Sequence, residues 1–477
     1  MTDGSGSAPP VWRCPPAAPL VTDLYEVSMA LVYLRQGRTG PATFSLTVRD
    51  LPPQRGFLVA AGLADVLDFL ERFEIGEDEL AAFADALGCP LPDLAPLRGL
   101  RFTGDVWAVP EGRVVLAGEP LLEVTAPLPQ AQLVETFLLN QVVHQTMLTS
   151  KAARCVLAAQ GTPVVDFGLR RTHGVEAGMH AARAGAVVGF AGTSNVAAAR
   201  RYGLAASGTM AHSFIEAFPD EEQAFRTFAH ETCGPVTLLV DTYDTGRGVQ
   251  IAIKVLRELP GHRSGGVRLD SGDLAALAGR ARRALDAAAL PRARIVVSGG
   301  LDEYAIEDLV AAAAPVDVFA VGTRVSTSAD APYLDAAYKL VEYDGRPVMK
   351  LSAGKVTAPG AKQVFRSPGL SDELALRAEQ RPEGTEPLLQ PVLRAGRRLQ
   401  TPPSAADQAV LAGRRFRSDA AHLPPALRTI RHPGRLLPRP SERLLRLTTE
   451  LRRTLQAPAG TVLTSGAESG AASRPDA

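Results

Sequence analysis

The sequence has few of the features that mark secreted, membrane-bound or nucleic-acid-binding proteins. It contains only 4 Cys in 477 residues, far apart and without the paired Cys or His spacing of a structural zinc site. No apolar run reaches the ~20 residues of a membrane-spanning helix, and the N-terminus lacks the charged and apolar regions of a signal peptide. Basic and acidic residues balance at 51 each, so no net charge favours a nucleic acid or a membrane as partner. These absences predict a cytoplasmic protein with reduced thiols.

One segment departs from this charge balance. Between Arg394 and Arg453 the chain has 14 Arg and four acidic residues. A polyanion-binding patch is one interpretation, but the aromatic side chains on which single-stranded nucleic acids stack are nearly absent there. We therefore expect a solvated face with salt bridges, and no nucleic-acid partner.

Short polar motifs recur in the middle of the chain, each directly after an apolar run. Three of these runs, VTLLV, RIVV and VDVFAV, end at Val240, Val297 and Val321, and Ala-rich helical stretches separate several of them. This alternation predicts βα units around a parallel sheet, where chemistry collects on the loops at the carboxyl ends of the strands. The loops carry small, acidic or basic residues, so we expect an enzyme that handles phosphates. The motifs are DFGLRR (166–171), GTSN (192–195), SGTMAH (207–212), DTYD (241–244), RLDSGD (268–273), SGG (298–300) and GT (322–323).

Composition divides the chain into five parts. Residues 1–16 and 456–477 are rich in small residues and proline, and we expect them to be disordered. Residues 17–135 mix helical and strand-like runs, as in an α+β domain. Residues 136–349 carry the βα pattern, and residues 350–455 are irregular and rich in Pro and Arg. Near the junction of these last two parts, the stretch KLVEYDGRPVMKLSA contains an Asp-Gly pair that predicts a β-hairpin turn.

A longer set of stretches accompanies these motifs. They are TDLYEVSMA (22–30), RGFLVAAGL (55–63), LLNQVVHQTMLTSKAAR (138–154), DFGLRRTHG (166–174), FAGTSNVAAARRYGLAASGTMAHSF (190–214), LLVDTYDT (238–245), GVRLDSGDL (266–274), VSGGLDE (297–303) and VGTRVSTS (321–328). In sequence and in order, from about residue 18 to 455, they resemble the nicotinate phosphoribosyltransferase family. The resemblance implies an α/β fold with an irregular, incomplete (β/α) barrel as its core. It also implies a second α+β domain built from the N-terminal and C-terminal segments, 17–135 and 350–455.

The resemblance also implies an activity. A type II phosphoribosyltransferase of this kind joins nicotinate to 5-phosphoribosyl 1-pyrophosphate, giving nicotinate mononucleotide and pyrophosphate in the salvage route of NAD biosynthesis. The family reaction is coupled to ATP hydrolysis through a phosphohistidine, as in a ligase. It needs Mg²⁺, held mainly through the substrate pyrophosphate, and the enzyme is a homodimer with shared active sites. His212 matches the phosphorylated motif, and imidazole is a competent phosphoryl acceptor; an arbitrary loop histidine would be assigned no role.

Charged residues after two predicted strands are implied to do the chemistry. In the family the arginine that matches Arg268 lies near nicotinate, whose carboxylate a guanidinium can hold through paired hydrogen bonds. An isolated strand-end arginine is otherwise a salt-bridge partner. Asp270 and Asp241, with Asp273, are implied to hold the ribose hydroxyls or Mg²⁺. For Asp273, capping of the helix that begins near Leu274 is the alternative.

Four further residues are implied to hold the pyridine ring and select the substrate. Tyr25 and Phe167 are candidate stacking platforms, with Tyr25 supplied by the second subunit; a buried core ring is the alternative for each. Thr209 is implied to complete the nicotinate site. The resembling nicotinamide phosphoribosyltransferases have aspartate at the position of Ser194, where a carboxylate would repel nicotinate. A serine hydroxyl can donate a hydrogen bond to nicotinate, so the acid is the favoured substrate.

Two glycine-containing loops fit a 5′-phosphate, because glycine lets backbone N–H groups approach phosphate oxygens, although Gly-Gly after a strand is also simply a turn. Basic side chains supply cations for the pyrophosphate, and we expect at least one of them to form a structural ion pair instead. The residues assigned to phosphoribosyl pyrophosphate are Lys151, Arg154, Arg170, Arg171, Asp273, Gly299, Gly300, Gly322 and Thr323.

The sequence leaves other functions open. The main alternative is a nicotinamide phosphoribosyltransferase or a related pyridine phosphoribosyltransferase, although the two carboxylates of quinolinate call for a denser basic cluster. A sensor of NAD precursors that kept the pocket is a further alternative. Loss of His212, Asp270 or Arg268 would favour the sensor, and all three residues are present.

Overall fold

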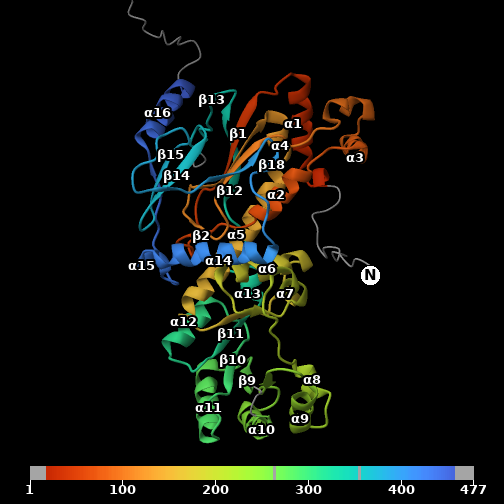
Figure 1. The fold of residues 1–477 in the computed structure, drawn as a ribbon, viewed down its shortest axis with the longest axis vertical. Helices are drawn as coiled ribbons and strands as arrows, with labels where there is room; N and C mark the ends of the chain where they lie inside the picture. The colour runs from red at the N-terminus through yellow and green to blue at the C-terminus, as the bar shows by residue number, and fades with distance from the viewer. Residues whose placement is uncertain (1–17, 261–264, 353–355, 457–477) are drawn as a thin grey trace, which may run out of the picture.

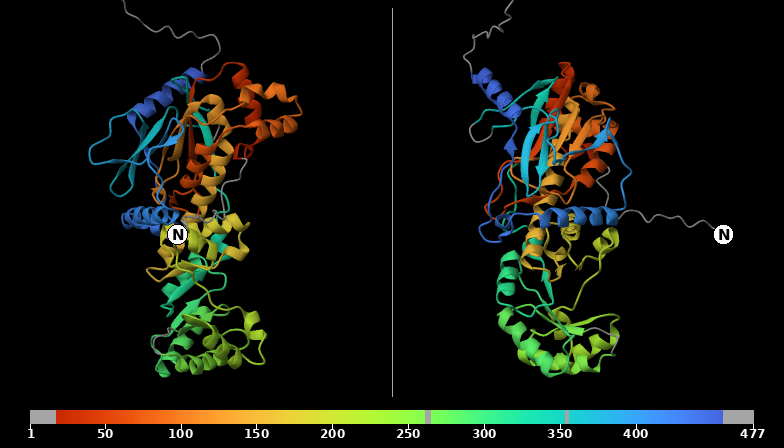
Figure 2. Two further views of the ribbon diagram at one scale, coloured as in Figure 1. Left: turned by 45° about the vertical axis from the view of Figure 1, so that its right-hand side comes forward. Right: turned by 60° about the vertical axis from the view of Figure 1, so that its left-hand side comes forward.

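The computed structural model describes residues 18–260, 265–352 and 356–456. The chain forms two lobes: its N-terminal and C-terminal segments build the upper lobe, and its middle builds the lower one (Figures 1 and 2). The predicted disordered ends fall almost wholly outside the described residues. Gln456 is the exception, because it is the last residue of helix α16.

The lower lobe is built on a six-stranded parallel sheet with the order β7-β6-β11-β10-β9-β8. Helices alternate with these strands along the chain, so the predicted βα units are confirmed. In the described part of the chain the sheet ends at β7 and β8, which makes it an incomplete barrel. The strands are β6 (Val164–Asp166), β7 (Gly192–Thr193), β8 (Val236–Leu239), β9 (Gly265–Leu269), β10 (Arg294–Val297) and β11 (Val318–Val321). The helices are α6 (Val175–Val188), α7 (Val196–Tyr202), α8 (His212–Glu216), α9 (Glu221–Glu231), α10 (Thr245–Glu258), α11 (Leu274–Ala287), α12 (Glu303–Ala311) and α13 (Thr323–Ser326).

Local sequence accounts for these βα units. The strands are short apolar runs with fully buried residues such as Leu238 and Ile295, as expected for the strands of a parallel sheet. Asp244, Asp273 and Asp302 then cap α10, α11 and α12 by accepting hydrogen bonds from first-turn N–H groups. The chain therefore changes from strand to helix within a few residues, and the loops between them stay short.

The upper lobe combines both ends of the chain, which confirms the predicted second α+β domain. Its antiparallel sheet has the order β13-β12-β1-β5-β3-β17-β18, and a second sheet has the order β16-β14-β15-β19. The strands are β1 (Pro41–Val48), β2 (Leu58–Val59), β3 (Asp105–Ala108), β4 (Val114–Val115), β5 (Pro120–Pro127), β12 (Ala336–Tyr343), β13 (Arg346–Pro347), β14 (Lys362–Ser367), β15 (Ser371–Leu376), β16 (Glu386–Pro387), β17 (Gln390–Arg394), β18 (Arg397–Arg398) and β19 (Arg439–Pro440). The helices are α1 (Leu24–Arg35), α2 (Leu63–Arg72), α3 (Glu77–Leu87), α4 (Leu128–Leu133) and α16 (Glu442–Gln456).

Strand β12 corrects the predicted boundary between the two domains. It pairs with β1 along its length, so residues 336–349 belong to the upper lobe and not to the barrel. The predicted hairpin turn follows it. Asp344 and Gly345 join β12 to β13 with φ values of 51° and 72°, and a type I′ turn requires a positive φ at both positions.

Helix α14 (Ala405–Ala421) gives a second correction. It lies between the two lobes in Figure 1 and packs on α6. Its residues Ala412 and Phe416 are part of the lower core, as is Leu427 of the following helix α15 (Pro425–Arg428). Part of the segment 350–455 therefore belongs with the barrel and not with the α+β domain.

Helix α5 (Glu135–Ala158) joins the two cores. Phe137 and Val142 near its start are buried in the upper core, and Ala152 and Cys155 near its end are buried in the lower core. Although α5 has 24 residues, neither it nor any other helix among the described residues is long and apolar enough to cross a membrane. The helix fixes the barrel relative to the α+β domain.

Candidate active site

The predicted polar motifs converge at one edge of the parallel sheet. Because the six strands run parallel, their carboxyl ends lie on the same side of the sheet. Backbone hydrogen bonds continue beyond the strand ends, from Phe167 N–H to the Val321 carbonyl at 2.7 Å and from Ser298 N–H to the Leu269 carbonyl at 2.9 Å. The residues that follow the strand ends are Phe167 after β6, Ser194 after β7, Asp241 after β8, Asp270 after β9, Ser298 after β10 and Gly322 after β11.

Arg268 lies at the centre of a hydrogen-bond network at this edge. Its side chain lies near the end of β9, where it is 10% exposed. Nε donates to Ser298 Oγ at 2.8 Å, Nη2 to Asp270 Oδ1 at 2.7 Å, and Nη1 to Thr209 Oγ1 at 2.9 Å and to the Met210 carbonyl at 3.2 Å. A guanidinium has five N–H donors, so these four bonds leave one N–H, on Nη2, for a ligand.

Asp270 and Asp241 lie side by side next to Arg268. Asp241 Oδ2 accepts hydrogen bonds from the Asp270 backbone N–H at 2.9 Å and from Ser271 Oγ at 2.6 Å, while its buried Oδ1 has no hydrogen-bond partner among the described residues. Burial alone would raise the pKa of Asp270, but hydrogen bonds from Ser298 and Arg268 outweigh it and lower that pKa. Asp270 is therefore an ionised carboxylate at neutral pH.

His212 begins α8 and faces the same two strand ends. Its Nδ1 lies 3.1 Å from Thr242 Oγ1, and its Nε2 lies 3.9 Å from Asp270 Oδ2. The side chain is 39% exposed, so it can be reached from solvent. Thr242 can hold one ring nitrogen while the other stays open to a reactant.

The loops after β6 and β7 are held together by Asp166. Its Oδ2 accepts a hydrogen bond from Thr193 Oγ1 at 2.7 Å, and its carbonyl accepts one from Ser194 N–H at 2.8 Å. Burial raises the pKa of Asp166, and its hydrogen bonds oppose that shift. Between these loops and β9, the guanidinium carbon of Arg268 lies 5.7 Å from the centre of the Phe167 ring. Ser194, which follows β7, is exposed.

The loop after β10 needs both of its glycines. Gly299 has a φ of +90°, and a Cβ atom there would lie 1.8 Å from the Asp270 carbonyl oxygen. Gly300 has a φ of +67° with open space around it, so only its backbone conformation calls for glycine. The two residues bring exposed backbone close against the β9 loop, as the predicted phosphate loop requires.

The loop after β11 is tied to the β10 loop. Gly322 and Thr323 lead into the short helix α13, whose Arg324 Nη1 donates to Asp302 Oδ2 at 2.9 Å. Asp302 also caps α12. The two candidate phosphate loops are therefore held together by one ion pair.

The sequence matches one family in both halves of the chain. Residues 20–143 match the nicotinate phosphoribosyltransferase (NAPRTase) N-terminal domain, and residues 162–358 match the nicotinate phosphoribosyltransferase (NAPRTase) family. The chain is 48% identical over 428 residues to a nicotinate phosphoribosyltransferase of Mycobacterium tuberculosis, which covers 87% of this chain and 89% of that protein. This chain belongs to the nicotinate phosphoribosyltransferase family.

Further comparisons agree with that assignment. The nicotinate phosphoribosyltransferase of Bacillus subtilis is 44% identical over 357 residues, covering 73% of this chain and 72% of that protein. The crystal structure of human nicotinic acid phosphoribosyltransferase superposes with a TM-score of 0.77 at 31% identity, covering 90% of this chain and 99% of that one. A nicotinate-nucleotide pyrophosphorylase from Pyrococcus furiosus superposes with a TM-score of 0.69 at 26% identity, covering 84% and 96%. The family resemblance and the fold predicted from the sequence are confirmed.

Lys151 and Arg154 lie in a buried ion-pair cluster with Glu303, the residue after Asp302. Lys151 Nζ contacts Glu303 and lies 2.8 Å from Asp330 Oδ1, and Arg154 Nε lies 2.9 Å from Glu303 Oε1. Lys151 is 0% exposed. The structure thus gives both cations carboxylate partners inside the protein, which corrects their assignment as pyrophosphate ligands. Arg55 completes the cluster through Asp330 at 3.1 Å.

The remaining predicted residues are placed less directly. Arg170 and Arg171 are exposed in a 3₁₀ turn after Phe167. Asp273 is the N-cap of α11 and accepts from Ala276 N–H at 3.1 Å, so the capping alternative holds for one of its oxygens. Tyr25 lies in α1 of the upper lobe, 49% exposed, while β9 lies in the lower lobe (Figure 1). One chain does not bring Tyr25 to the candidate site.

Sequence reasoning missed three residues that organise the site. Ser298 holds Arg268, Thr242 holds His212, and Asp166 joins two loops. Each stands inside a recognised polar motif at or shortly after the end of a strand, and that position was the available signal. The hydrogen-bond partners were not predictable, because each partner belongs to a different element of the fold, 27 to 30 residues away in the sequence.

The carboxylates suit a divalent cation held partly by a substrate. Asp241 offers a buried oxygen without a hydrogen-bond partner, and Asp270 is ionised beside it. Oxygen ligands of this type fit Mg²⁺, which keeps few protein ligands when it binds substrate phosphates. Among the described residues no group of three or more His, Cys, Asp and Glu side chains forms a metal cluster.

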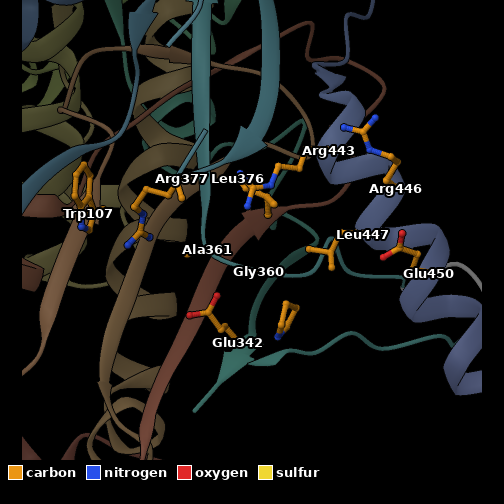
Figure 3. Close-up of a pocket in the computed structure, with 12 residues that line it drawn as sticks. Trp107, Glu342, Gly360, Ala361, Leu376, Arg377, Arg443, Arg446, Leu447 and Glu450 are labelled. Carbon is orange, nitrogen blue, oxygen red and sulfur yellow. The ribbon is translucent and has the colours of Figure 1, made fainter. Parts of the chain in front are cut away.

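A cavity of about 760 Å³ lies away from this site, in the upper lobe between the sheets and α16 (Figure 3). Figure 3 shows Arg377, Arg443 and Arg446 around it, together with Glu342 and Glu450. No residue predicted to bind substrate lines it. The cavity is therefore separate from the candidate active site.

Proposed function

We propose that this protein joins nicotinate to 5-phosphoribosyl 1-pyrophosphate, forming nicotinate mononucleotide and pyrophosphate in a salvage route to NAD. The observation that carries the proposal is the cluster of Arg268, Asp270 and His212 at one edge of a barrel of this family. In the reaction the ring nitrogen of nicotinate attacks C1 of the ribose. The C1–O bond to pyrophosphate breaks, and its electron pair leaves with pyrophosphate.

Nicotinate would lie between Phe167, Ser194 and Arg268. The free N–H of Arg268 Nη2 and the Ser194 hydroxyl can donate to its carboxylate, and the guanidinium charge favours an anion. Because Asp270 already occupies one N–H of Nη2, a paired clamp on nicotinate would require Asp270 to release Arg268. We therefore expect one charged hydrogen bond from Arg268, assisted by Ser194.

Phosphoribosyl pyrophosphate would lie across the β9, β10 and β11 loops. Exposed backbone at Gly299, Gly300 and Thr323 suits the 5′-phosphate, and Asp241 and Asp270 suit the ribose hydroxyls or Mg²⁺. When bound, Mg²⁺ would neutralise part of the charge that develops on the leaving pyrophosphate.

ATP coupling would pass through His212. If Nδ1–H donates to Thr242, Nε2 carries the lone pair that attacks the γ-phosphorus of ATP, and the bond to ADP breaks as the new N–P bond forms. Phosphorylation would add negative charge at Nε2, an atom that lies 3.9 Å from Asp270 Oδ2, and this charge would alter affinity for the pyrophosphate product. Acid-labile phosphate on His212 after incubation with ATP supports this step, whereas phosphate on another residue contradicts it.

The substrate assignment is tested by offering labelled phosphoribosyl pyrophosphate with nicotinate, nicotinamide or quinolinate, each with and without ATP. We expect strong preference for nicotinate and stimulation by ATP. Equal use of nicotinate and nicotinamide would overturn the role given to Ser194, and preferential use of either alternative would overturn the proposed reaction.

A homodimer would supply Tyr25 to the neighbouring subunit. Tyr25→Ala and Arg268→Ala should each be inactive alone, and mixing them should restore activity, because a hybrid dimer has one site with neither defect. Recovery should approach about one quarter of the wild-type level when exchange is random. Exchange shown by tagged pull-down without recovered activity would place Tyr25 outside the neighbouring site.

A further inference from the structure

The carboxyl group next to Tyr25 in sequence is buried between two helices. Glu26 lies in the first turn of α1 and is 0% exposed. Its Oε2 accepts a hydrogen bond from Thr22 Oγ1 at 2.5 Å, and its Oε1 accepts one from the backbone N–H of Thr136, in the first turn of α5, at 3.1 Å. The nearby cation Lys339 lies 3.9 Å from Glu135. The Glu26 carboxyl group therefore joins the starts of α1 and α5 through neutral partners.

The hydrogen bonds of the Thr136 hydroxyl group indicate that a carboxyl group in this contact is protonated. Its oxygen lies 2.7 Å from Glu26 Oε1 and 2.9 Å from Asp23 Oδ2, and it accepts a hydrogen bond from Asp23 N–H at 3.2 Å. A hydroxyl group has one hydrogen to donate and two lone pairs, so it cannot donate to both carboxylates. If the Thr136 hydroxyl group donates to Asp23 and accepts from a protonated Glu26, then each of these oxygen–oxygen distances corresponds to a hydrogen bond with its own hydrogen atom. Asp23 is exposed and Glu26 is buried, so the extra proton belongs on Glu26.

The surrounding charges favour the same protonation state. Burial raises the pKa of Glu26 to about 7; the hydrogen bonds from Thr22 and Thr136 oppose the shift, and the carboxylates of Glu135 and Asp23 add to it. Tyr25 of α1, with Tyr338 and Lys339 of β12, completes the titratable groups around this contact. The one cation among them is already engaged by Glu135.

We propose that Glu26 is a positioning residue that works as a neutral carboxylic acid, locking the first turn of α1 onto α5 and so orienting Tyr25 for the pyridine ring. The proposal rests on the proposed role of Tyr25. Loss of the proton would bury a charge without a cation, and the first turn of α1 would have to shift to hydrate it. Nicotinate binding should therefore weaken as the pH rises.

The variant Glu26→Gln distinguishes an effect of the Glu26 proton from an effect of side-chain shape. Its amide NH₂ can donate to Thr136 Oγ1 and its carbonyl can accept from Thr22, without titrating, while the Thr136 backbone N–H loses its acceptor at the Oε1 position. In the wild-type enzyme we expect the KM for nicotinate to rise about tenfold per pH unit above about pH 7. In Glu26→Gln we expect that rise to disappear, with a KM near the low-pH wild-type value. Glu79→Gln is the matched control, because Glu79 is also the third residue of its helix, α3, but is partly exposed; it should keep the wild-type pH profile.

Infrared spectroscopy reads the proton directly. Between about pH 6 and about pH 9 the wild-type protein should lose one carbonyl band of a protonated carboxylic acid that Glu26→Gln does not have; the bands of other protonated carboxyl groups, such as Glu119, are common to both proteins. Absence of that band, or a KM rise that persists in Glu26→Gln, overturns the proposal. If the band is present but the KM for nicotinate does not change with pH in either protein, Glu26 is protonated but its proton does not position Tyr25, and the proposal is overturned. A Tyr25→Ala variant with unchanged KM would instead refute the ring-binding role within the proposed function, and the infrared result would still decide the state of Glu26.

Discussion

Replacing Thr242 with valine should slow phosphorylation of His212 while leaving the rest of the site in place. Thr242 Oγ1 is 3.1 Å from Nδ1 of the imidazole, so it orients the ring, and when Nδ1–H donates to it, Nε2 carries the lone pair. Valine has nearly the shape of threonine but lacks the hydroxyl group. The substitution therefore removes one hydrogen bond and little packing.

The size of the effect follows from the character of that hydrogen bond. A neutral hydrogen bond contributes about 0.5–1.5 kcal/mol, which corresponds to roughly a 2- to 13-fold lower rate of phosphoryl transfer to His212. The effect should be no larger, because the substitution removes this one hydrogen bond and little packing. Phosphoribosyl transfer in the absence of ATP should be unchanged, since Thr242 holds neither Arg268 nor the phosphate loops.

Quenched-flow incorporation of labelled phosphate from ATP into acid-labile form measures the rate. Thr242→Ser keeps the hydroxyl group and is the matched control, expected within about 2-fold of wild type. An unchanged rate in Thr242→Val, or a serine variant as slow as the valine variant, would refute the argument that the hydroxyl group holds Nδ1.

Three further predictions test other parts of the structure. Ser194→Asp should lower kcat/KM for nicotinate by about 5- to 1000-fold, from ~1–4 kcal/mol of repulsion at ~4 Å, with the smaller values expected at this exposed position; Ser194→Asn should stay close to wild type, and equal losses in both variants would contradict charge repulsion. Lys151→Met should lower the free energy of unfolding in urea by about 1.5–3 kcal/mol, because Glu303 and Asp330 lose charged hydrogen bonds but keep Arg154 and Arg55 as partners; unchanged stability with a raised KM for phosphoribosyl pyrophosphate would restore Lys151 as a ligand. Burial and a neighbouring carboxylate raise the pKa of Glu119, so the Glu119 proton stabilises the fold at low pH, and this contribution falls as the pH rises through the folded-state pKa. Glu119→Gln should therefore reduce the fall in the urea midpoint of unfolding between about pH 5 and about pH 8. The same fall in wild type and Glu119→Gln would contradict this prediction.

The barrel was predictable because its signals are local. Each strand is an apolar run, and a capping aspartate such as Asp273 follows within a few residues. β12 carried no comparable signal for its place in the fold. Its partner β1 lies nearly 300 residues earlier in the chain, and a strand-like run does not state which sheet it joins. Because β12 directly follows the βα region in the sequence, it was wrongly assigned to the barrel.

The candidate site shows the same division between local and distant information. Arg268, Asp270 and His212 were found because their motifs are distinctive and stand at strand ends. Lys151 was misassigned because its partners, Glu303 at the start of α12 and Asp330, lie about 150 residues or more further along the chain. A basic side chain in the sequence does not reveal whether a carboxylate elsewhere in the fold already neutralises it.

Helix α5 decides how Tyr25 and Arg268 can meet. The two residues belong to different lobes (Figure 1), and a single chain could join them only by moving one lobe against the other. Every residue of α5 from 145 to 155 is buried, and a hinge there would open both cores and break the ion pairs of Lys151. Opening a buried ion pair alone costs about 3–5 kcal/mol, before any apolar surface is exposed. A second copy of the chain, meeting the exposed side chain of Tyr25, needs no such rearrangement, and this is the physical reason for expecting shared sites in a dimer.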